Sequence, residues 1–391
     1  LPNCISLPSG TGRSECHSFL LQVTVCRLRT HQWCFILFNV VLFHALLFGG
    51  DLLEEYFLRS LPITYTDAKI LKIREKAREL DMEPRKTNIS KSYTISGSEA
   101  CSNQEVFLLT IICSRPENRT RRDAIRQTWR NMTSIRGYAL LTLFALGKPS
   151  AETMQQEINK ESQKHDDIIE GSFLDSSRNQ TWKTLMSMEW TVTFCSHARF
   201  ILLMEEEVFV SLPSLAEYLF SLRTHLEDIY TGRVIHQGEP DRDPQSPGFV
   251  PLSQYPDKYY PDYCSGTAFV ISQDVARKVF IASKEMPVSV PPDVFVGICA
   301  KNAGITPLHS SRFSGKRHVR YNRCCYKFIF TSSEMADDEL LQEWQEISNG
   351  KDWTLLETYY RLVSCKVLTY FDKFKHFNID AIKKEALHFS D

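Results

Sequence analysis

Residues Val106–Cys113 form the unbroken apolar run VFLLTIIC, in which β-branched and aromatic residues predominate. A strand with one face in water alternates apolar and polar side chains, and this run does not alternate. It therefore predicts a strand that is buried on both faces, as in the mostly parallel sheet of an α/β domain.

The residues after this run predict a helix and then a repeated alternation of strand and helix. Thr120 can cap a helix on which Ile125 and Trp129 lie four residues apart on one face. Later segments are ALLTLFA, RFILLM and TAFVI at residues 139–145, 199–204 and 267–271, with a helical stretch at 181–194. This order predicts a mostly parallel sheet flanked by helices, and no internal repeat is visible.

A second apolar run, WCFILFNVVLFHALLFGG at Trp33–Gly50, lies near the N-terminus. At roughly 1.5 Å per helical residue it nearly spans a hydrocarbon core of about 30 Å. Basic residues precede it and acidic residues follow it: Arg27, Arg29, Asp51, Glu54 and Glu55. This charge bias predicts a single-pass type II signal anchor with the N-terminus in the cytosol. A cleaved signal peptide is the alternative, but the run is longer than the usual apolar region of such peptides.

Four parts are expected along the chain. Residues 1–32 would be cytosolic, with 1–22 treated as doubtful because the chain starts at Leu1; residues 33–50 would be the transmembrane signal anchor. Residues 51–103 are rich in charge and helix formers, which is typical of a stem. Residues 104–391 would form the lumenal domain.

Sequons and cysteines agree with a lumenal body. N-glycosylation triplets begin at Asn88, Asn118, Asn131 and Asn179. Eight cysteines follow the anchor, an even number that suits disulfides in an oxidising compartment, although the pairing cannot be deduced from the sequence. Their spacing does not match a structural zinc site.

The composition sets limits on partners. The 391 residues are 43% hydrophobic, which is enough for one large domain or two modest ones. With 46 Lys and Arg against 47 Asp and Glu, the net charge of −1 offers no overall attraction to nucleic acid.

The acidic run Glu205-Glu206-Glu207 comes directly after the predicted strand RFILLM. In open parallel sheets ligands bind beyond the carboxyl ends of the strands, where this run would lie. If the backbone stays extended, Glu205 and Glu207 point to one side and Glu206 to the other, so the outer pair could face a divalent cation. From charge alone, a solvated acidic loop is the simpler interpretation.

A family resemblance favours the first interpretation. Seven segments occur in order: FLLTI at 107–111, TRRDAIRQTW at 120–129, FALG at 144–147, DIIEGSFLDSSRNQTWKT at 167–184, EEEVFV at 205–210, YPDYCSGTAFVIS at 260–272 and DVFVGICAKNAG at 293–304. From Phe107 to about Phe330 the chain thus resembles the β-1,3-galactosyltransferase and β-1,3-N-acetylglucosaminyltransferase family, glycosyltransferase family 31. The resemblance implies a GT-A-like, Rossmann-type mixed sheet and an inverting, UDP-hexose-dependent transferase in the Golgi membrane.

The resemblance also implies roles for the acidic residues. Glu205 and Glu207 occupy the outer positions of the family's metal-binding triplet, and Glu207 would be the direct ligand of Mn²⁺. Asp293 stands at the family's general base, which takes the proton of the acceptor hydroxyl as its oxygen attacks. Without the resemblance, Asp293 would be read as a carboxylate favoured at a helix N-terminus.

Further roles concern the donor and the sugars. Arg122 and Arg126, with Glu205 and Glu206, would contact the nucleotide of UDP-galactose, because guanidinium groups suit phosphate oxygens. A plain solvated basic face is the alternative for the two arginines. The family's loop beside the reacting sugars corresponds to Tyr260, Tyr263, Ser265 and Gly266; a core role with a disulfide is the alternative there. Lys183 is expected to be structural.

The chain also departs from the family pattern. The triplet is Glu throughout, each one methylene longer than Asp, and Leu203 and Pro292 stand where the family has Lys and Glu. Two functions follow from the sequence. The first is transfer of a hexose, galactose from UDP-galactose, in β-1,3 linkage onto the glycan of a glycoprotein or glycolipid. The second is a catalytically weak member that acts as a Golgi glycan-binding or partner protein.

Overall fold

The structure is a computed structural model of the 391-residue chain. It describes residues 30–57, 67–82, 93–102, 105–222, 227–246, 248–286, 290–314, 328–348 and 354–367. The chain divides into two compact units, Leu1–Leu52 and Leu53–Asp391, and each is described by itself.

The helix α2 (Thr30–Phe57) makes up the described part of the first unit and continues into the second. Within it, the 19 residues His31–Gly49 are long and apolar enough to cross a membrane, and only 6% of that window is buried. Apolar side chains such as Phe35, Leu37 and Val41 are exposed to the surroundings. Its length and composition are those of a helix that can cross a membrane.

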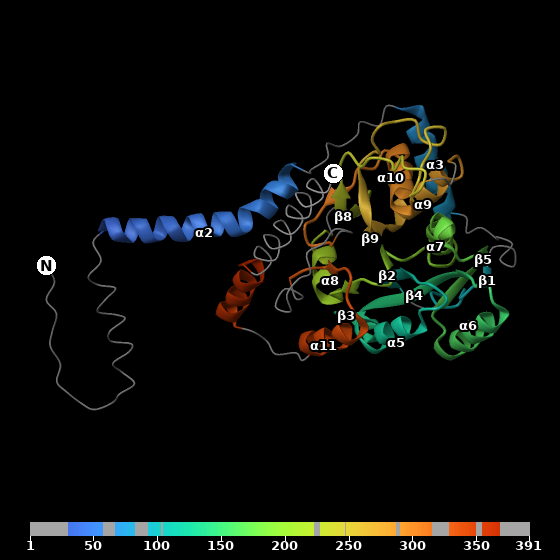
Figure 1. Ribbon diagram of the computed structural model, residues 1–391, viewed down its shortest axis with the longest axis horizontal. Helices are drawn as coiled ribbons and strands as arrows, with labels where there is room; N and C mark the ends of the chain where they lie inside the picture. Colours follow the sequence, from blue (N-terminus) through green and yellow to red (C-terminus); the bar gives the residue numbers. More distant parts are fainter. Residues whose placement is uncertain are drawn as a thin grey trace, which may run out of the picture. The chain divides into compact units, whose positions relative to one another are not determined.

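The second unit is built on a nine-stranded mixed sheet (Figure 1). Its strands are β1 (Tyr93–Ile95), β2 (Val106–Cys113), β3 (Ser134–Ile135), β4 (Tyr138–Lys148), β5 (Ile168–Leu174), β6 (Phe200–Glu205), β8 (Tyr230–Ile235), β9 (Tyr263–Ser272) and β10 (Leu308–His309). The order is β1-β5-β4-β2-β6-β9-β8-β10, with β3 beside β4. The strands β5, β4, β2 and β6 run parallel, whereas β9 is antiparallel to both β6 and β8. A separate pair joins β7 (Phe209–Val210) to β11 (Thr331–Ser332).

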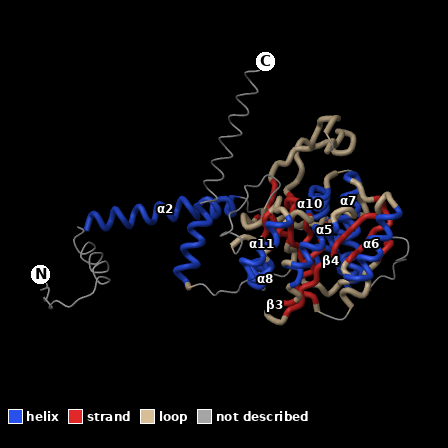
Figure 2. The backbone as a smooth tube through the Cα atoms, turned by 60° about the horizontal axis from the view of Figure 1, so that its bottom comes forward, coloured by secondary structure: helices blue, strands red, loops and turns tan. Residues whose placement is uncertain are grey.

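Helices cover both faces of this sheet (Figures 1 and 2). They are α3 (Ala68–Met82), α5 (Arg119–Gln127), α6 (Glu152–His165), α7 (Gln180–Phe194), α8 (Leu212–Ser221), α9 (Gln273–Ser283), α10 (Pro292–Asn302) and α11 (Asp337–Ser348). Residues 355–367 are also helical. The mixed α/β sheet flanked by helices confirms the predicted fold class.

The central strand β2 shows why the apolar run does not alternate. Leu109 and Ile111 lie in a core with residues of α3, α7, α9 and α10. Leu108 and Ile112 lie in a second core with residues of α5, α6 and α8. The strand is therefore buried on both faces, as its sequence predicted.

Part of the expected stem belongs to the folded domain. Helix α3 packs against α9 and buries Ile73 and Ala77, and β1 pairs with β5. Cys101 forms a disulfide with Cys195. The boundary expected at residue 104 is thus corrected, and the domain begins at or before Ala68. The charged residues of α3 lie around a narrow apolar stripe, which low average hydrophobicity hides.

Candidate functional site

The carboxyl ends of the parallel strands carry a buried polar network. Lys183 of α7 is 1% exposed, and its Nζ lies 2.7 Å from the carbonyl oxygen of Ser114 and 2.7 Å from Oδ2 of Asp175. The same Asp175 oxygen accepts a hydrogen bond from the N–H of Gly147 at 2.8 Å. Lys183 thereby joins the ends of β2, β4 and β5, which agrees with its expected structural role.

The acidic run lies at the end of β6, next to this network. Glu206 is 3% exposed, while Glu205 and Glu207 are exposed. The Glu206 carboxylate accepts hydrogen bonds from Ser114 Oγ at 2.5 Å and from the N–H of Arg115 at 3.3 Å. Asn118 Nδ2 donates to it at 2.5 Å. The backbone does not stay extended here: Glu206 and Glu207 form a turn, and the N–H of Val208 donates to the carbonyl oxygen of Glu205 at 3.3 Å. In this turn the middle residue is buried and the outer pair is exposed.

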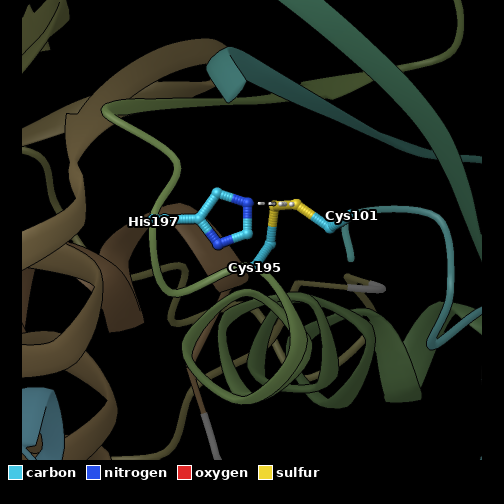
Figure 3. A group of neighbouring side chains, drawn as sticks. All are labelled: Cys101, Cys195 and His197. Atoms are coloured by element: carbon cyan, nitrogen blue, oxygen red, sulfur yellow. Dashed lines mark hydrogen bonds between the residues drawn. A yellow bond between two sulfur atoms is a disulfide. The ribbon is translucent and has the colours of Figure 1, made fainter. Parts of the chain in front are cut away.

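Two exposed carboxylates suit a hard cation that takes further ligands from water and phosphate oxygens. Among the described residues, one group of three metal-ligand side chains converges: Cys101, Cys195 and His197 (Figure 3). There the two sulfurs are bonded to each other, and His197 Nε2 lies 3.6 Å from Cys101 Sγ. Because metals bind thiolates, this disulfide-bonded group does not compete with the acidic run as a metal site.

Asp293 lies in the first turn of α10 and is 5% exposed. Its Oδ2 accepts a hydrogen bond from the N–H of Gly266 at 3.1 Å, and its Oδ1 accepts one from its neighbour Val294 at 3.0 Å. A Cβ atom at Gly266 would lie 3.1 Å from Asp293 Cβ and 3.2 Å from its Oδ2. Glycine on β9 therefore permits the close approach that positions this carboxylate.

The pairing of β6 with β9 brings the acidic run and Asp293 to the same edge of the sheet. Met204 is opposite Ala268 in this antiparallel register. The chain continues from Met204 into Glu205 and Glu206, while Gly266 lies two residues before Ala268. Both segments extend past the last pair in the same direction, so the Asp293 that rests on Gly266 faces the end of β6 that carries the acidic run.

The predicted sugar loop packs beside Asp293. Tyr260 and Tyr263 make an edge contact with ring centroids 6.3 Å apart. Burial, with a contribution from the charge of Asp293, raises the pKa of each phenol to about 12. Both hydroxyl groups are therefore neutral near neutral pH, and the buried Tyr260 hydroxyl has no protein partner among the described residues. A neutral phenol can donate a hydrogen bond to a sugar oxygen.

Ser265, also predicted for this loop, points elsewhere. It is 2% exposed, and its Oγ lies 3.3 Å from Oγ1 of Thr267. Cys264 and Cys299, near the loop, are free thiols. Among the described residues no disulfide forms at Cys264. Hydrogen bonds hold the loop instead: the N–H of Tyr260 donates to the carbonyl oxygen of Gly238 at 2.7 Å, and the N–H of Cys264 donates to the Tyr230 hydroxyl at 2.9 Å.

The structure corrects the role expected for Arg122. Its side chain is fully buried and donates from Nε and Nη2 to Glu161 at 2.8 Å each. Its remaining bonds go to Ser114 Oγ and to the carbonyls of Arg115 and Pro116. All donor positions of the guanidinium are engaged, which leaves none for a diphosphate.

Arg126 is engaged in the same way. It donates to Asp167 through Nε at 2.9 Å and through Nη2 at 2.8 Å, to Glu161 at 2.7 Å and to Asp123 at 2.8 Å. Hydrogen bonds to Asp167 and Glu161 raise the pKa of Arg126 against the opposing effect of burial. Both arginines are buried in ion pairs that join α5 to α6 and to Asp167, the residue just before β5, so neither lies on a solvated basic face.

The sequons differ in exposure. Asn131 is exposed. Asn179 donates from Nδ2 to the carbonyl oxygen of Leu174 at 2.8 Å, and Asn118 is bonded to Glu206. Asn88 lies outside the described residues.

Sequence reasoning missed a His–Asp pair beside the sugar loop. His236 Nδ1 lies 2.9 Å from Oδ1 of Asp262. The two residues are brought together because Ile235 of β8 is opposite Tyr263 of β9. The signal was available only through this strand pairing, since the residues lie far apart in the sequence.

Comparison with known proteins agrees with these features. A protein-family model described as Galactosyltransferase matches residues 120–311. Human beta-1,3-galactosyltransferase 9 is 62% identical over 371 residues, which cover 95% of this chain and 100% of that protein. Human lactosylceramide 1,3-N-acetyl-beta-D-glucosaminyltransferase is 37% identical over 71% of this chain and 75% of its own length. Mouse beta-1,3-galactosyltransferase 1 is 34% identical over 67% of this chain and 80% of its own length. The chain therefore belongs to the galactosyltransferase family and is a glycosyltransferase.

Proposed function

We propose that the protein transfers galactose from UDP-galactose to a hydroxyl group of a glycan acceptor, in β-1,3 linkage and with inversion. The observation that carries the proposal is the shared sheet edge of the acidic run and Asp293, which the β6–β9 register brings about. The relative that covers almost the whole chain, a β-1,3-galactosyltransferase at 62% identity, supports galactose as the sugar.

Asp293 would act as the general base. Its carboxylate takes the proton of the acceptor hydroxyl while that oxygen attacks the anomeric carbon of galactose. The bond from the anomeric carbon to the UDP oxygen breaks on the opposite face, and UDP departs with the bonding electrons. The N–H of Gly266, at 3.1 Å, fixes the carboxylate for this step, and Tyr260 and Tyr263 beside it would contact the sugars.

Glu205 and Glu207 would hold Mn²⁺ through their exposed carboxylates, with Glu207 as the direct ligand. When bound, such a cation neutralises the charge that accumulates on the diphosphate of the departing UDP. Glu206 is buried and would act on the donor site through its neighbours rather than by direct contact.

A Golgi membrane location with a type II anchor completes the proposal. The apolar helix at His31–Gly49 supports the anchor. The Cys101–Cys195 disulfide and the exposed sequon at Asn131 suit a lumenal domain.

The test is to purify the full chain in detergent and to measure UDP release from UDP-galactose and UDP-N-acetylglucosamine. The reactions contain Mn²⁺ and a panel of glycan acceptors. Asp293→Asn and Glu207→Gln should each lower kcat/KM with the preferred donor by at least about 100-fold. Glu157→Gln, at an exposed position of α6, is the matched control.

Three results would contradict the proposal in different ways. Preference for UDP-N-acetylglucosamine would change the sugar. Release that neither substitution affects would remove these residues from the site. Glycan binding without release from any donor would favour the glycan-binding alternative.

A further inference from the structure

Asn118 occupies the position just before α5, where an asparagine ordinarily caps the helix through its side chain. Here the side chain makes no capping hydrogen bond. Its Nδ2 instead donates to Oε1 of Glu206 at 2.5 Å, across 88 residues of sequence. Asn118 has thus exchanged a local role for a contact with the acidic run.

Glu206 depends on this contact because its carboxylate is buried among neutral donors. Ser114 Oγ donates to Oε2, and the N–H of Arg115 reaches both oxygens at 3.3 Å. Asn118 gives the short hydrogen bond to Oε1. A buried carboxylate that loses a donor is costly, so without Asn118 it would be expected to turn toward water.

Glu206 anchors the turn that follows β6. The N–H of Val208 donates to the carbonyl oxygen of Glu205 at 3.3 Å, and within this turn Glu206 is buried while Glu205 and Glu207 are exposed. Arg121 strengthens this arrangement, because its Nε donates to the carbonyl oxygen of Glu206 at 2.7 Å. The outward pair is the one that would meet a cation.

We propose that Asn118 is a positioning residue of the acidic run, acting through Glu206, and that its sequon is not glycosylated in the active protein. A glycan would be attached to the same Nδ2 atom that lies 2.5 Å from the carboxylate, in a partly buried site. Since glycans are added before folding is complete, a sugar there would keep the Glu206 contact from forming. The positioning role rests on the proposed function, whereas the glycosylation state does not.

The test uses the full chain from a secretory host, in which two kinds of substitution separate the sequon from the amide. Thr120→Val removes the sequon at an exposed residue and keeps Asn118. Asn118→Ala removes both, and Asn118→Ser removes both but retains a residue that caps helices well. Asn131→Gln serves as the control for loss of a glycan.

Intact mass with and without endoglycosidase reports the glycans, calorimetry reports binding of UDP with Mn²⁺, and thermal unfolding reports the fold. Thr120→Val should leave glycan mass and UDP binding unchanged. Asn118→Ala and Asn118→Ser should both leave the glycan mass unchanged. Both should weaken Mn²⁺-dependent UDP binding by about 10-fold, which is the smaller effect expected when a residue that supports metal ligands without touching the metal is lost.

If Thr120→Val has the mass of one glycan less than the wild type, the sequon at Asn118 is glycosylated and this part of the proposal is wrong. Wild-type UDP binding in Asn118→Ser would overturn the positioning role, because it would show that the contact with Glu206 is not needed for Mn²⁺-dependent binding. If the wild-type chain itself binds no UDP with Mn²⁺, the proposed function and the positioning role fail together, while the mass result still decides the glycosylation state.

Discussion

The N–H of Gly266 donates to Oδ2 of Asp293 at 3.1 Å, and a Cβ atom at Gly266 would lie 3.1 Å from the Cβ of Asp293. The strand β9 and the helix α10 therefore meet at a distance that only glycine allows without displacement. The position of the proposed base depends on a residue that carries no side chain of its own.

Replacing Gly266 by alanine is expected to lower kcat more than it lowers stability. The added methyl group would displace Asp293 by a few tenths of an ångström, and such a misplacement of a catalytic group costs about 10-fold in rate. Gly248→Ala is the matched control, because its nearest neighbour would be 3.6 Å away. UDP release and thermal unfolding of both variants provide the measurement. Wild-type kcat in Gly266→Ala would show that this contact does not position the base.

Arg122 is expected to matter for stability and not for donor binding. Arg122→Ala would leave the buried Glu161 with only part of its counter-charge, and breaking a buried pair of this kind costs about 3–5 kcal/mol. Arg119→Ala, on the exposed side of α5, should cost less than about 1 kcal/mol. Denaturant unfolding gives both values. A stable Arg122→Ala that fails to bind UDP would restore the nucleotide-binding role that the structure argues against.

The contrast between Arg122 and the acidic run shows how far the sequence could lead. The strand VFLLTIIC and the alternation of strands and helices followed from local periodicity. Periodicity did not predict the turn at Glu206 and Glu207, in which Glu206 is buried between two exposed glutamates. The partners of the two arginines could not be predicted in this way, because Glu161 of α6 and Asp167, just before β5, reach α5 only after the sheet has formed. The contact of Asn118 with Glu206 could not be predicted for the same reason, since the two residues meet only in the tertiary structure.

Glu170 is expected to make stability depend on pH. Burial raises the pKa of this carboxyl group, and hydrogen bonds from Gln155 oppose the rise in part. The folded protein then binds more protons than the unfolded chain between the ordinary and the raised pKa. Stability therefore falls as pH rises through that window and stays lower above it.

Glu170→Gln should remove this penalty, since the amide keeps the shape and can also donate to the buried Gln155 Oε1, which has no partner among the described residues. The melting temperature at pH 7.5 should rise by about 2 °C, and by less at pH 5. Glu157→Gln, which is exposed, should show no such difference between the two pH values. An equal shift at both pH values would mean that Glu170 does not titrate differently in the folded state.

Docking of α3 onto the domain can be tested with two substitutions on the same helix. Ile73 is 3% exposed and faces the core of the second unit, whereas Leu71 is 51% exposed. Arg74 fixes the helix further, through hydrogen bonds to Asp228 Oδ2 at 2.6 Å and to the carbonyl of Ala303 at 3.1 Å.

Ile73→Ala should lower the free energy of unfolding by about 2–4 kcal/mol, because it removes buried methylene groups and leaves a cavity. Leu71→Ala should change it by less than about 0.5 kcal/mol. Equal effects of the two substitutions would indicate that α3 is not part of the cooperative unit. If Ile73→Ala destabilises the protein more than Leu71→Ala, α3 contributes to the stability of the domain. A fragment that begins at residue 104 lacks both this helix and Cys101, so it should unfold at lower denaturant concentration than one that begins at residue 67.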